Sequence, residues 1–296
     1  MLLTKCEFSL YADDLKIFKI IKSEEDVLSL QRSLTIVYDW CKQNGMLLNS
    51  SKCNVMTFTR KSTFTKFTYN IGNTVLEQVS FVKDLGVILD KSLSFDLHID
   101  KICNSGHNIL GFIKRRAKEF DDMFLTKQLY SALVRSRMEY ASIVWSPYTN
   151  SRIDPIESVQ KQFLLFALRN LGFSGYRLPK YEERLLLIDM VTLKQRRELA
   201  SALFGFDLVR NNINCPELCE RIVFTSHDYN TRNKRPIVEE FYRNDFSMHN
   251  PLNECIRNFN KYKNQYSMNV TKETFKLNIL RKMKTLFNQG QGLSVN

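Results

Sequence analysis

The sequence predicts an α+β fold in which a small β-containing part precedes a mostly α-helical part. Near the N-terminus apolar residues alternate with polar ones, and short β-type runs follow between residues 53 and 89. After Asp96 apolar residues recur at helical spacing through most of the chain. The change of period predicts a boundary near residues 92–96. We therefore expect domains at 1–92, 93–172 and 173–296, the last helical and basic.

The N-terminal segment predicts a β-hairpin followed by a helix. Strands are expected at Glu7–Tyr11 and at 15–21, on either side of the polar tripeptide Ala12-Asp13-Asp14. Ser23 then marks the start of a helix over residues 24–44. Its hydroxyl can cap free amides, and the three acidic residues that follow face the positive end of the helix dipole.

Short β-type runs predict a small antiparallel region in residues 53–89. They lie at 55–59, 67–71, 75–76 and 82–89, with Gly72-Asn73 as a turn between two of them. Beyond this region helices are expected at 98–119, 124–145, 155–171 and 181–209, with shorter ones at 215–221 and near 272–287. Trp145 and Phe163 should be buried in the helical part.

Composition indicates a globular chain with a polyanionic partner. Hydrophobic residues make up 44% of the 296, which is enough to fill a core. Lys and Arg number 43 against 31 Asp and Glu, a formal charge of +12. This excess favours nucleic acid or an acidic membrane face, although an inert basic surface is the alternative.

Location follows from the absence of two signals. No apolar run reaches the roughly 20 residues needed to cross a bilayer. Lys5 and Glu7 interrupt the N-terminal stretch, so it does not resemble a signal peptide. We expect an intracellular protein, cytoplasmic or nuclear and not secreted. Its seven scattered cysteines should then be small buried hydrophobes rather than a disulfide framework.

The adjacent carboxylates of Asp13 and Asp14 are the strongest chemical signal. At a hairpin tip they could offer hard oxygen ligands to Mg²⁺ for phosphoryl transfer. A two-metal site usually needs one more carboxylate from another strand, and none is identifiable nearby. The alternative is that the pair forms only the polar turn of a surface hairpin.

Further motifs follow this tip in a fixed order. The tip itself is Tyr11-Ala12-Asp13-Asp14. The motifs that follow are Leu47-Leu48-Asn49-Ser50-Ser51-Lys52-Cys53, Val82-Lys83-Asp84-Leu85-Gly86-Val87, Phe95-Asp96-Leu97-His98-Ile99, Leu129-Tyr130-Ser131-Ala132-Leu133-Val134-Arg135-Ser136, Val144-Trp145-Ser146-Pro147 and Ile156-Glu157-Ser158-Val159-Gln160-Lys161. In order and spacing the chain resembles the C-terminal part of a reverse transcriptase from a non-LTR retrotransposon of the Jockey type. The resemblance is closest up to Phe166.

The resemblance implies a partial palm, then a helical thumb and connection, that bind an RNA template and a DNA primer. It implies that Asp13 and Asp14 hold Mg²⁺, and that Lys52 lies near the pyrophosphate of the incoming nucleotide. It places Tyr11, Leu85 and Gly86 against nucleic acid, the last two in a hairpin that grips the primer. It implies that the protein binds neither a membrane nor a small-molecule cofactor. The alternatives are a solvated lysine at Lys52 and an ordinary strand glycine at Gly86.

One part of the family pattern is missing from this sequence. The first metal-binding aspartate strand, the fingers and the template-binding motif, which precede the Tyr11 motif in the family, are not found. We therefore expect a truncated fragment that is catalytically incomplete. Two alternatives are a non-catalytic thumb module that binds nucleic acid and a non-functional relic.

Basic residues form two groups that could bind phosphates without reading sequence. One is Lys114, Arg115, Arg116 and Lys118, expected to be exposed; the other spans residues 257–284, with eight Lys or Arg and the single acid Glu273. Interleaved aromatics could stack on bases, but their helical spacing favours the core. They are Phe112, Phe120, Tyr262, Tyr266 and Phe275.

Cys215, Cys219 and His227 resemble the start of a zinc knuckle. Tetrahedral zinc needs four ligands, and Thr231 and Arg232 stand where the fourth ligand should follow. Zinc binding is therefore not expected at these residues.

Overall fold

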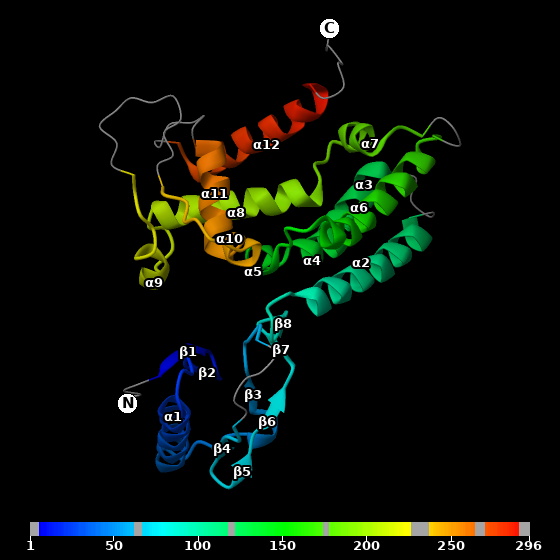
Figure 1. Cartoon of the computed structure of the whole chain (residues 1–296). Coiled ribbons are helices and arrows are strands. Elements are labelled where there is room, and N and C mark those ends of the chain that lie inside the picture. The colour runs from blue at the N-terminus through cyan, green and yellow to red at the C-terminus, as the bar shows by residue number, and fades with distance from the viewer. Residues whose placement is uncertain are drawn as a thin grey trace. The chain divides into compact units, whose positions relative to one another are not determined.

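The computed structural model describes residues 6–61, 67–117, 122–173, 178–225, 237–263 and 270–289. The chain divides into two compact units, Met1–Phe95 and Asp96–Asn296, each described below by itself (Figure 1). Strands are concentrated in the first unit and long helices in the second. The predicted α+β class is thus confirmed. The finer division at residue 172 stays a prediction.

The first unit begins with the predicted hairpin and helix. Strands β1 (Glu7–Tyr11) and β2 (Asp14–Phe18) pair antiparallel, and helix α1 spans Glu24–Gln43. Ser23 and Asp26 form a capping box, in which the Asp26 amide donates to the Ser23 hydroxyl at 3.4 Å and the Ser23 amide donates to the Asp26 carboxylate at 3.0 Å. Two free amides are satisfied in this way, which explains where α1 begins.

After the 3₁₀ turn η1 (Ser50–Lys52), three more two-stranded sheets complete the first unit. They pair β3 (Asn54–Met56) with β6 (Glu77–Val79), β4 (Asn70–Ile71) with β5 (Thr74–Val75), and β7 (Phe81–Asp84) with β8 (Val87–Asp90). The Gly72-Asn73 turn is confirmed between β4 and β5.

One detail of the predicted β region is wrong. Strands β3 and β6 run parallel, because the β4–β5 hairpin lies between them and returns the chain in its original direction. The run at 82–89 forms the hairpin that the family resemblance implies, and the chain reverses at Leu85-Gly86. Alternation of apolar residues encodes which face is buried, but neither the direction of a strand nor a turn inside an apolar run.

The core of the first unit is small and lies under α1. Its buried members are Val27, Tyr69, Ile71 and Leu76. The Gln31 side chain fastens α1 to β4, since it accepts from the Asn70 amide and donates to the Asn70 carbonyl, both at 2.9 Å. A few apolar side chains and this amide pair therefore hold the helix to the sheets.

The second unit is helical, as predicted. Its long helices are α2 (Asp96–Arg116), α6 (Asn150–Asn170), α8 (Leu193–Val209), α11 (Pro251–Lys263) and α12 (Lys272–Gln289). Shorter ones are α3 (Met123–Leu129), the π-helix η3 (Tyr130–Arg135), α4 (Ser136–Glu139), α5 (Ser142–Trp145), α7 (Tyr181–Leu187), α9 (Pro216–Cys219) and α10 (Asp245–Met248). The sequence did not predict α11.

Two helices predicted as continuous are interrupted. The segment 124–145 contains the π-helical turn η3 and a break at Ala141, whose φ of 50° no right-handed helix allows. The segment 181–209 breaks at Asp189, with φ of 54°, and restarts at Leu193. Thr192 caps this second start in a box with Gln195. Apolar spacing passes through both breaks, so periodicity alone could not locate them.

The core of the second unit lies between packed helix pairs. Helices α2 and α6 run side by side in the same direction, and Arg152 joins their N-terminal ends through Asp96 at 2.7 Å and Asp100 at 3.1 Å (Figure 1). Trp145 and Phe163 are buried, as predicted, with 1% and 0% of their surfaces exposed. The Tyr130 ring stacks on Phe163 with 4.0 Å between centroids.

A second cluster of buried residues joins α8, α11 and α12. Phe206, Phe259 and Phe275 meet there. No helix within the described ranges is both long enough and apolar enough to cross a membrane.

Candidate functional site

The first candidate site is the tip of the β1–β2 hairpin. Tyr11 pairs with Asp14, so Ala12 and Asp13 form a two-residue loop. Ala12 has a φ of 51°, uncommon for a residue with a Cβ. Asp13 and Asp14 are exposed, as is Tyr11 at 62%. A tight, strained turn therefore presents two adjacent carboxylates to solvent.

The second predicted element, the turn at Leu85-Gly86, closes the β7–β8 hairpin. Asp84 pairs with Val87, and the loop residues have φ of 44° and 90°. Positive φ at both positions matches a type I′ turn, which suits the right-handed twist of hairpin strands. Glycine adopts this conformation freely, whereas a leucine there costs roughly 1–2 kcal/mol. Leu85 is nevertheless 46% exposed, so core packing does not compensate this cost in full.

An ion pair joins these two hairpins. The Lys16 ammonium lies 2.5 Å from the Asp84 carboxylate, at the end of β7 immediately before the turn. Lys16 lies opposite Ser9, two positions from the Tyr11–Asp14 pair, and therefore on the same face of the hairpin. The face that carries Asp14 is thus the face turned toward the Leu85-Gly86 hairpin. The family resemblance implies that both elements contact nucleic acid, and the ion pair between them is a finding of the structure.

The carboxylate oxygens at the tip suit a hard cation, but they come from only two residues. Two carboxylates have the right chemistry for Mg²⁺, which prefers oxygen ligands. Within the described ranges, no group of three His, Cys, Asp or Glu residues is placed to hold a metal. Lys52 is exposed at the end of η1, and no ion pair joins it to Asp13 or Asp14. The structure therefore brings Asp14 toward Leu85 and Gly86, but does not add Lys52 to this group.

The opposite face of the β1–β2 hairpin is apolar and largely uncovered. The register places Phe8 opposite Ile17 and Leu10 opposite Leu15, so these four side chains share one face. Phe8 is 56% exposed and Leu10 65%. In the described part of the chain no third strand pairs with either edge of this sheet. Such an open edge is a place where a further strand can pair.

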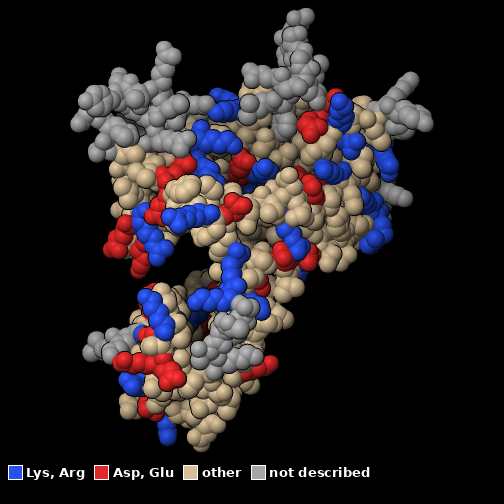
Figure 2. Space-filling model, in the orientation of Figure 1, with Lys and Arg blue, Asp and Glu red and all other residues tan. Residues whose placement is uncertain are grey.

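The basic cluster lies in the last turn of α2. Arg115 and Arg116 are exposed as predicted, whereas Lys114 is half-buried, and Lys118 lies outside the described residues. Partial burial and the nearby Arg169 both lower the pKa of Lys114. Arg169 is in the last turn of α6 and was not predicted as a member, since only the parallel packing of α2 and α6 brings it close. Figure 2 shows Lys and Arg side chains gathered where these two helices end.

The basic segment 257–284 is less available than its sequence suggests. Among its described residues, four cations are in ion pairs within the second unit. The pairs are Arg257–Glu254, Lys261–Glu198, Lys272–Asp207 and Lys284–Asp189. Tyr262 and Phe275 are each 2% exposed, which confirms the core alternative for them, while Phe112 is 50% exposed. Phe120 and Tyr266 lie outside the described residues. The side chains of this segment therefore stabilise the fold more than they form a surface that binds phosphates.

The cysteines form no site that the structure reveals. All seven are free thiols, but the burial expected of them holds for only three, since Cys6, Cys53, Cys215 and Cys219 are partly exposed. Cys41, Cys103 and Cys255 are buried, and burial raises the pKa of Cys103 to about 11. Cys215 precedes the short helix α9 and Cys219 is its last residue, whereas His227 lies outside the described residues.

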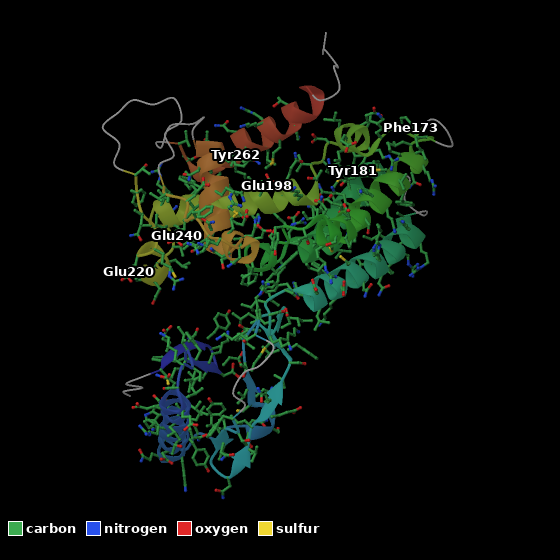
Figure 3. The ribbon with its side chains drawn as sticks, viewed as in Figure 1. Phe173, Tyr181, Glu198, Glu220, Glu240 and Tyr262 are labelled. Carbon is green, nitrogen blue, oxygen red and sulfur yellow. The ribbon has the colours of Figure 1, made fainter. Side chains whose placement is uncertain are left out.

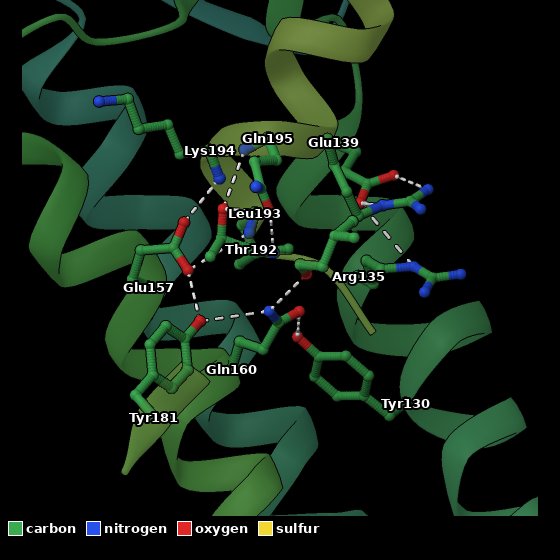
Figure 4. A network of polar contacts seen from close by, with 12 residues as sticks. Tyr130, Arg135, Glu139, Glu157, Gln160, Tyr181, Thr192, Leu193, Lys194 and Gln195 are labelled. Atoms are coloured by element: carbon green, nitrogen blue, oxygen red, sulfur yellow. Dashed lines mark hydrogen bonds and ion pairs between the residues drawn. The ribbon is translucent and has the colours of Figure 1, made fainter. Parts of the chain in front are cut away.

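A buried polar network inside the second unit was missed by sequence reasoning. The Glu157 carboxylate accepts from the Tyr181 hydroxyl at 2.7 Å and from the amides of Lys194 at 2.6 Å and Leu193 at 3.3 Å (Figure 4). It therefore satisfies free amides at the start of α8, where a negative charge is favoured. Figure 3 places Tyr181 beside α6 and Glu198 on α8.

Gln160 ties the same network together. Its amide nitrogen donates to the Val191 carbonyl at 2.9 Å, and its oxygen accepts from the Tyr130 hydroxyl at 3.2 Å. Burial raises the pKa of both Tyr130 and Tyr181, the latter also through the Glu157 charge, so both hydroxyls remain donors at neutral pH. The sequence signal that could have indicated this network is the pair Glu157 and Gln160, which lie one helical turn apart among apolar residues of α6.

Arg197 is the unusual member of this region. Only 2% of its surface is exposed, and none of its three guanidinium nitrogens has a hydrogen-bond partner among the described residues. Burial lowers its pKa, while the charges of Glu157 and Glu139 raise it. Glu139 is itself paired with Arg196 and lies 3.8 Å from Arg135. The region thus holds three arginines against two glutamates.

Comparison of this chain with protein-family models, with curated proteins and with solved structures finds no match.

Proposed function

We propose that this chain is the end of the palm, the thumb and the C-terminal region of an RNA-directed DNA polymerase of the non-LTR, Jockey-type retrotransposon class. The observation that carries the proposal is the Lys16–Asp84 ion pair. It turns the face bearing Asp14 toward the Leu85-Gly86 hairpin, so that a candidate metal site and a candidate primer contact lie on neighbouring elements of one unit.

In this proposal Asp13 and Asp14 hold Mg²⁺, which when bound neutralises charge on a triphosphate and favours attack by a primer hydroxyl. The turn at Leu85-Gly86 lets the backbone approach a primer strand closely, because glycine has no Cβ. Tyr11 flanks the metal ligands, and Lys52 offers a charge for a leaving pyrophosphate. The open edges of the β1–β2 sheet are where a further strand with the missing carboxylate would pair.

Counting ligands predicts that the isolated chain does not extend a primer. Mg²⁺ gives up its waters reluctantly and binds weakly to one or two exposed carboxylates. A primer-extension assay on an RNA template should therefore give no product with this chain alone. Robust extension would show that two carboxylates suffice and would contradict the incomplete-site proposal.

Restoring the missing strand tests the polymerase proposal itself. The chain is fused behind the fingers and first palm half of an active non-LTR reverse transcriptase, and extension is measured in Mg²⁺. We expect product, and we expect Asp13→Ala and Asp14→Ala each to abolish it. Asp39→Ala, at an exposed position on α1, is the matched control and should leave extension unchanged. Equal activity of the Asp13 and control variants would contradict the assignment.

A second candidate function is nucleic-acid binding without catalysis. The observation that favours it is the group of cations at the ends of α2 and α6, which does not depend on the hairpin tip. Cations there also face the negative ends of two helix dipoles, which holds them in place. Such a surface would contact phosphates and carry no sequence preference directly.

A salt titration of duplex binding tests this second function. If four to six phosphates are neutralised, affinity should fall with roughly the fourth to fifth power of salt concentration. Replacing Lys114, Arg115 and Arg116 together by Ala should lower that slope. Binding that is absent, or insensitive to salt, would remove this function and leave the relic reading.

A further inference from the structure

The second unit contains a pocket that neither the hairpin tip nor the basic helix ends use. It has a volume of about 260 Å³ and lies between the end of α5, the first turns of α6 and α8, and helix α11. Ile143, Pro147 and Ile153 give it an apolar floor. Its rim carries charged side chains from α8 and α11.

The charges on the rim leave one cation unpaired. Lys261 lies 2.7 Å from the Glu198 carboxylate, and Arg257 lies 2.6 Å from that of Glu254. Lys194 has no ion-pair partner for its ammonium among the described residues, although its backbone amide donates to Glu157. Figure 4 shows its side chain extending away from the Glu157 network. A ligand can therefore meet one available positive charge at this pocket.

An aromatic pair forms another part of the pocket lining. The rings of Tyr148 and His249 stack with 4.4 Å between centroids and 1° between planes. His249 is held by a hydrogen bond of 2.5 Å between its Nδ1 and Glu254. Tyr148 is 43% exposed, so part of its ring is open to solvent. Planar exposed aromatics of this kind are the surfaces on which unpaired bases stack.

We propose that this pocket binds one unpaired nucleotide of a single-stranded nucleic acid, with Lys194 contacting the phosphate and the Tyr148 ring stacking on the base. The class of ligand rests on the nucleic-acid partner proposed above. A duplex keeps its bases stacked inside, so its bases cannot enter the pocket. An acidic peptide would also bring negative charge to Lys194, but its carboxylate side chains offer no planar ring to stack on Tyr148.

Fluorescence anisotropy with a labelled single-stranded RNA oligonucleotide and, separately, a labelled duplex tests the proposal on the full chain. Tyr148→Ala and Lys194→Ala should each weaken single-strand binding by at least about fivefold, the equivalent of roughly 1 kcal/mol for one stacked base. Tyr148→Phe keeps the ring and should bind as the parent does. Lys101→Ala, an equal charge change at an exposed position on α2, is the control. Duplex binding should not change in any of the four.

A crosslinking experiment gives a readout that does not depend on affinity. An oligonucleotide carrying 5-iodouracil is irradiated with the parent chain, and the crosslinked peptide is identified by mass spectrometry. We expect the crosslink at Tyr148 or His249, and its loss in Tyr148→Ala with the same thermal unfolding as the parent.

The outcomes separate this inference from the proposed function. If the parent binds single strand and duplex, but Tyr148→Ala and Lys194→Ala bind single strand as tightly as Lys101→Ala, the pocket assignment is wrong and the proposed function stands. A crosslink confined to other residues also overturns the assignment. If the parent binds neither ligand, both the proposed nucleic-acid partner and the pocket assignment are contradicted.

Discussion

The two units bury their apolar side chains to very different degrees. In the second unit Phe163, Trp145 and Tyr130 are each at most 1% exposed and pack among several helices. In the first unit Leu10 is 65% exposed and Ile20 74%, and no sheet has more than two strands in the described residues. Isolated two-stranded hairpins are marginally stable at best in water.

This difference indicates that the units obtain their order from different sources. Fully buried apolar side chains hold the helices of the second unit together. The candidate chemistry of the first unit lies instead on hairpin tips, whose geometry depends on left-handed turn residues and one ion pair. Substitutions in the second unit should therefore mainly change its free energy of unfolding. Substitutions in the first unit should mainly change the geometry of its turns.

The largest effect is expected at Phe163. Phe163→Ala removes a fully buried ring that stacks on Tyr130, and should lower the free energy of unfolding of the second unit by about 3–5 kcal/mol. Phe124→Ala, at a position 69% exposed, should change it by less than about 0.5 kcal/mol. Urea unfolding followed by Trp145 fluorescence in a Trp40→Phe background measures both. If Leu10→Ala lowered the free energy of unfolding of the first unit by a similar amount, the two units would not differ in how they are stabilised.

Next in size is a pair of opposite effects in the buried network. Glu157→Ala leaves the Tyr181 hydroxyl and two α8 amides without an acceptor and removes one of the negative charges near the buried Arg197, so it should cost about 3–5 kcal/mol. Arg197→Met removes a buried guanidinium that makes no hydrogen bond, and should be neutral or stabilise by about 1 kcal/mol or more. Thermal unfolding distinguishes the signs. A large loss from Arg197→Met would mean that its nitrogens have partners such as ordered water.

A smaller effect, a gain in stability, is expected from one substitution at the β7–β8 turn. Leu85→Gly relieves a positive φ, and should stabilise the first unit by up to about 1 kcal/mol after the greater entropy of unfolded glycine is subtracted. Gly86→Ala, at φ of 90°, should destabilise it. Trp40 fluorescence in a Trp145→Phe background follows the first unit alone. Destabilisation by Leu85→Gly would mean that the leucine side chain contributes more than its turn conformation costs.

The smallest effect concerns pH and Asp90. Burial raises the pKa of this carboxyl, but hydrogen bonds from Ser92 and from the Phe95 amide at 2.9 Å outweigh it, so the pKa is lowered. A lowered pKa stabilises the folded state above the unfolded value, about 3.9 for Asp, and this contribution is lost as pH falls through the folded pKa. The first unit should therefore lose stability below about pH 4. Asp90→Asn should flatten that dependence, and an unchanged acid profile would contradict the assignment.

Local patterns predicted local structure well. The Glu7–Tyr11 strand, the start of α1 at Ser23 and the Gly72-Asn73 turn each follow from residues close together in the sequence. The parallel pairing of β3 with β6 and the break at Asp189 did not, because both depend on contacts with distant residues. Helix α11 was missed although its apolar residues share one face, since Asn and charged residues separate them.

The candidate site was predictable only as separate pieces. Sequence motifs singled out Asp13, Asp14, Leu85 and Gly86, but not the Lys16–Asp84 pair that relates them. Arg169 joins the basic cluster only because α2 and α6 run parallel. Glu157, Gln160 and Arg197 were missed as a network because isolated polar residues in a helix normally face solvent. Only the tertiary structure shows that they are buried together.

Gly205 determines how closely α8 and α11 approach each other. A Cβ at this position would lie 2.9 Å from the Cys255 carbonyl oxygen and 2.9 Å from the Phe259 Cβ, so the two backbones are nearly in contact. The register between the helices is then set by this contact rather than by the chain that connects them. Since the entropy of closing a loop rises by only about 0.6 kcal/mol for each doubling of its length, insertions into the connection should be tolerated.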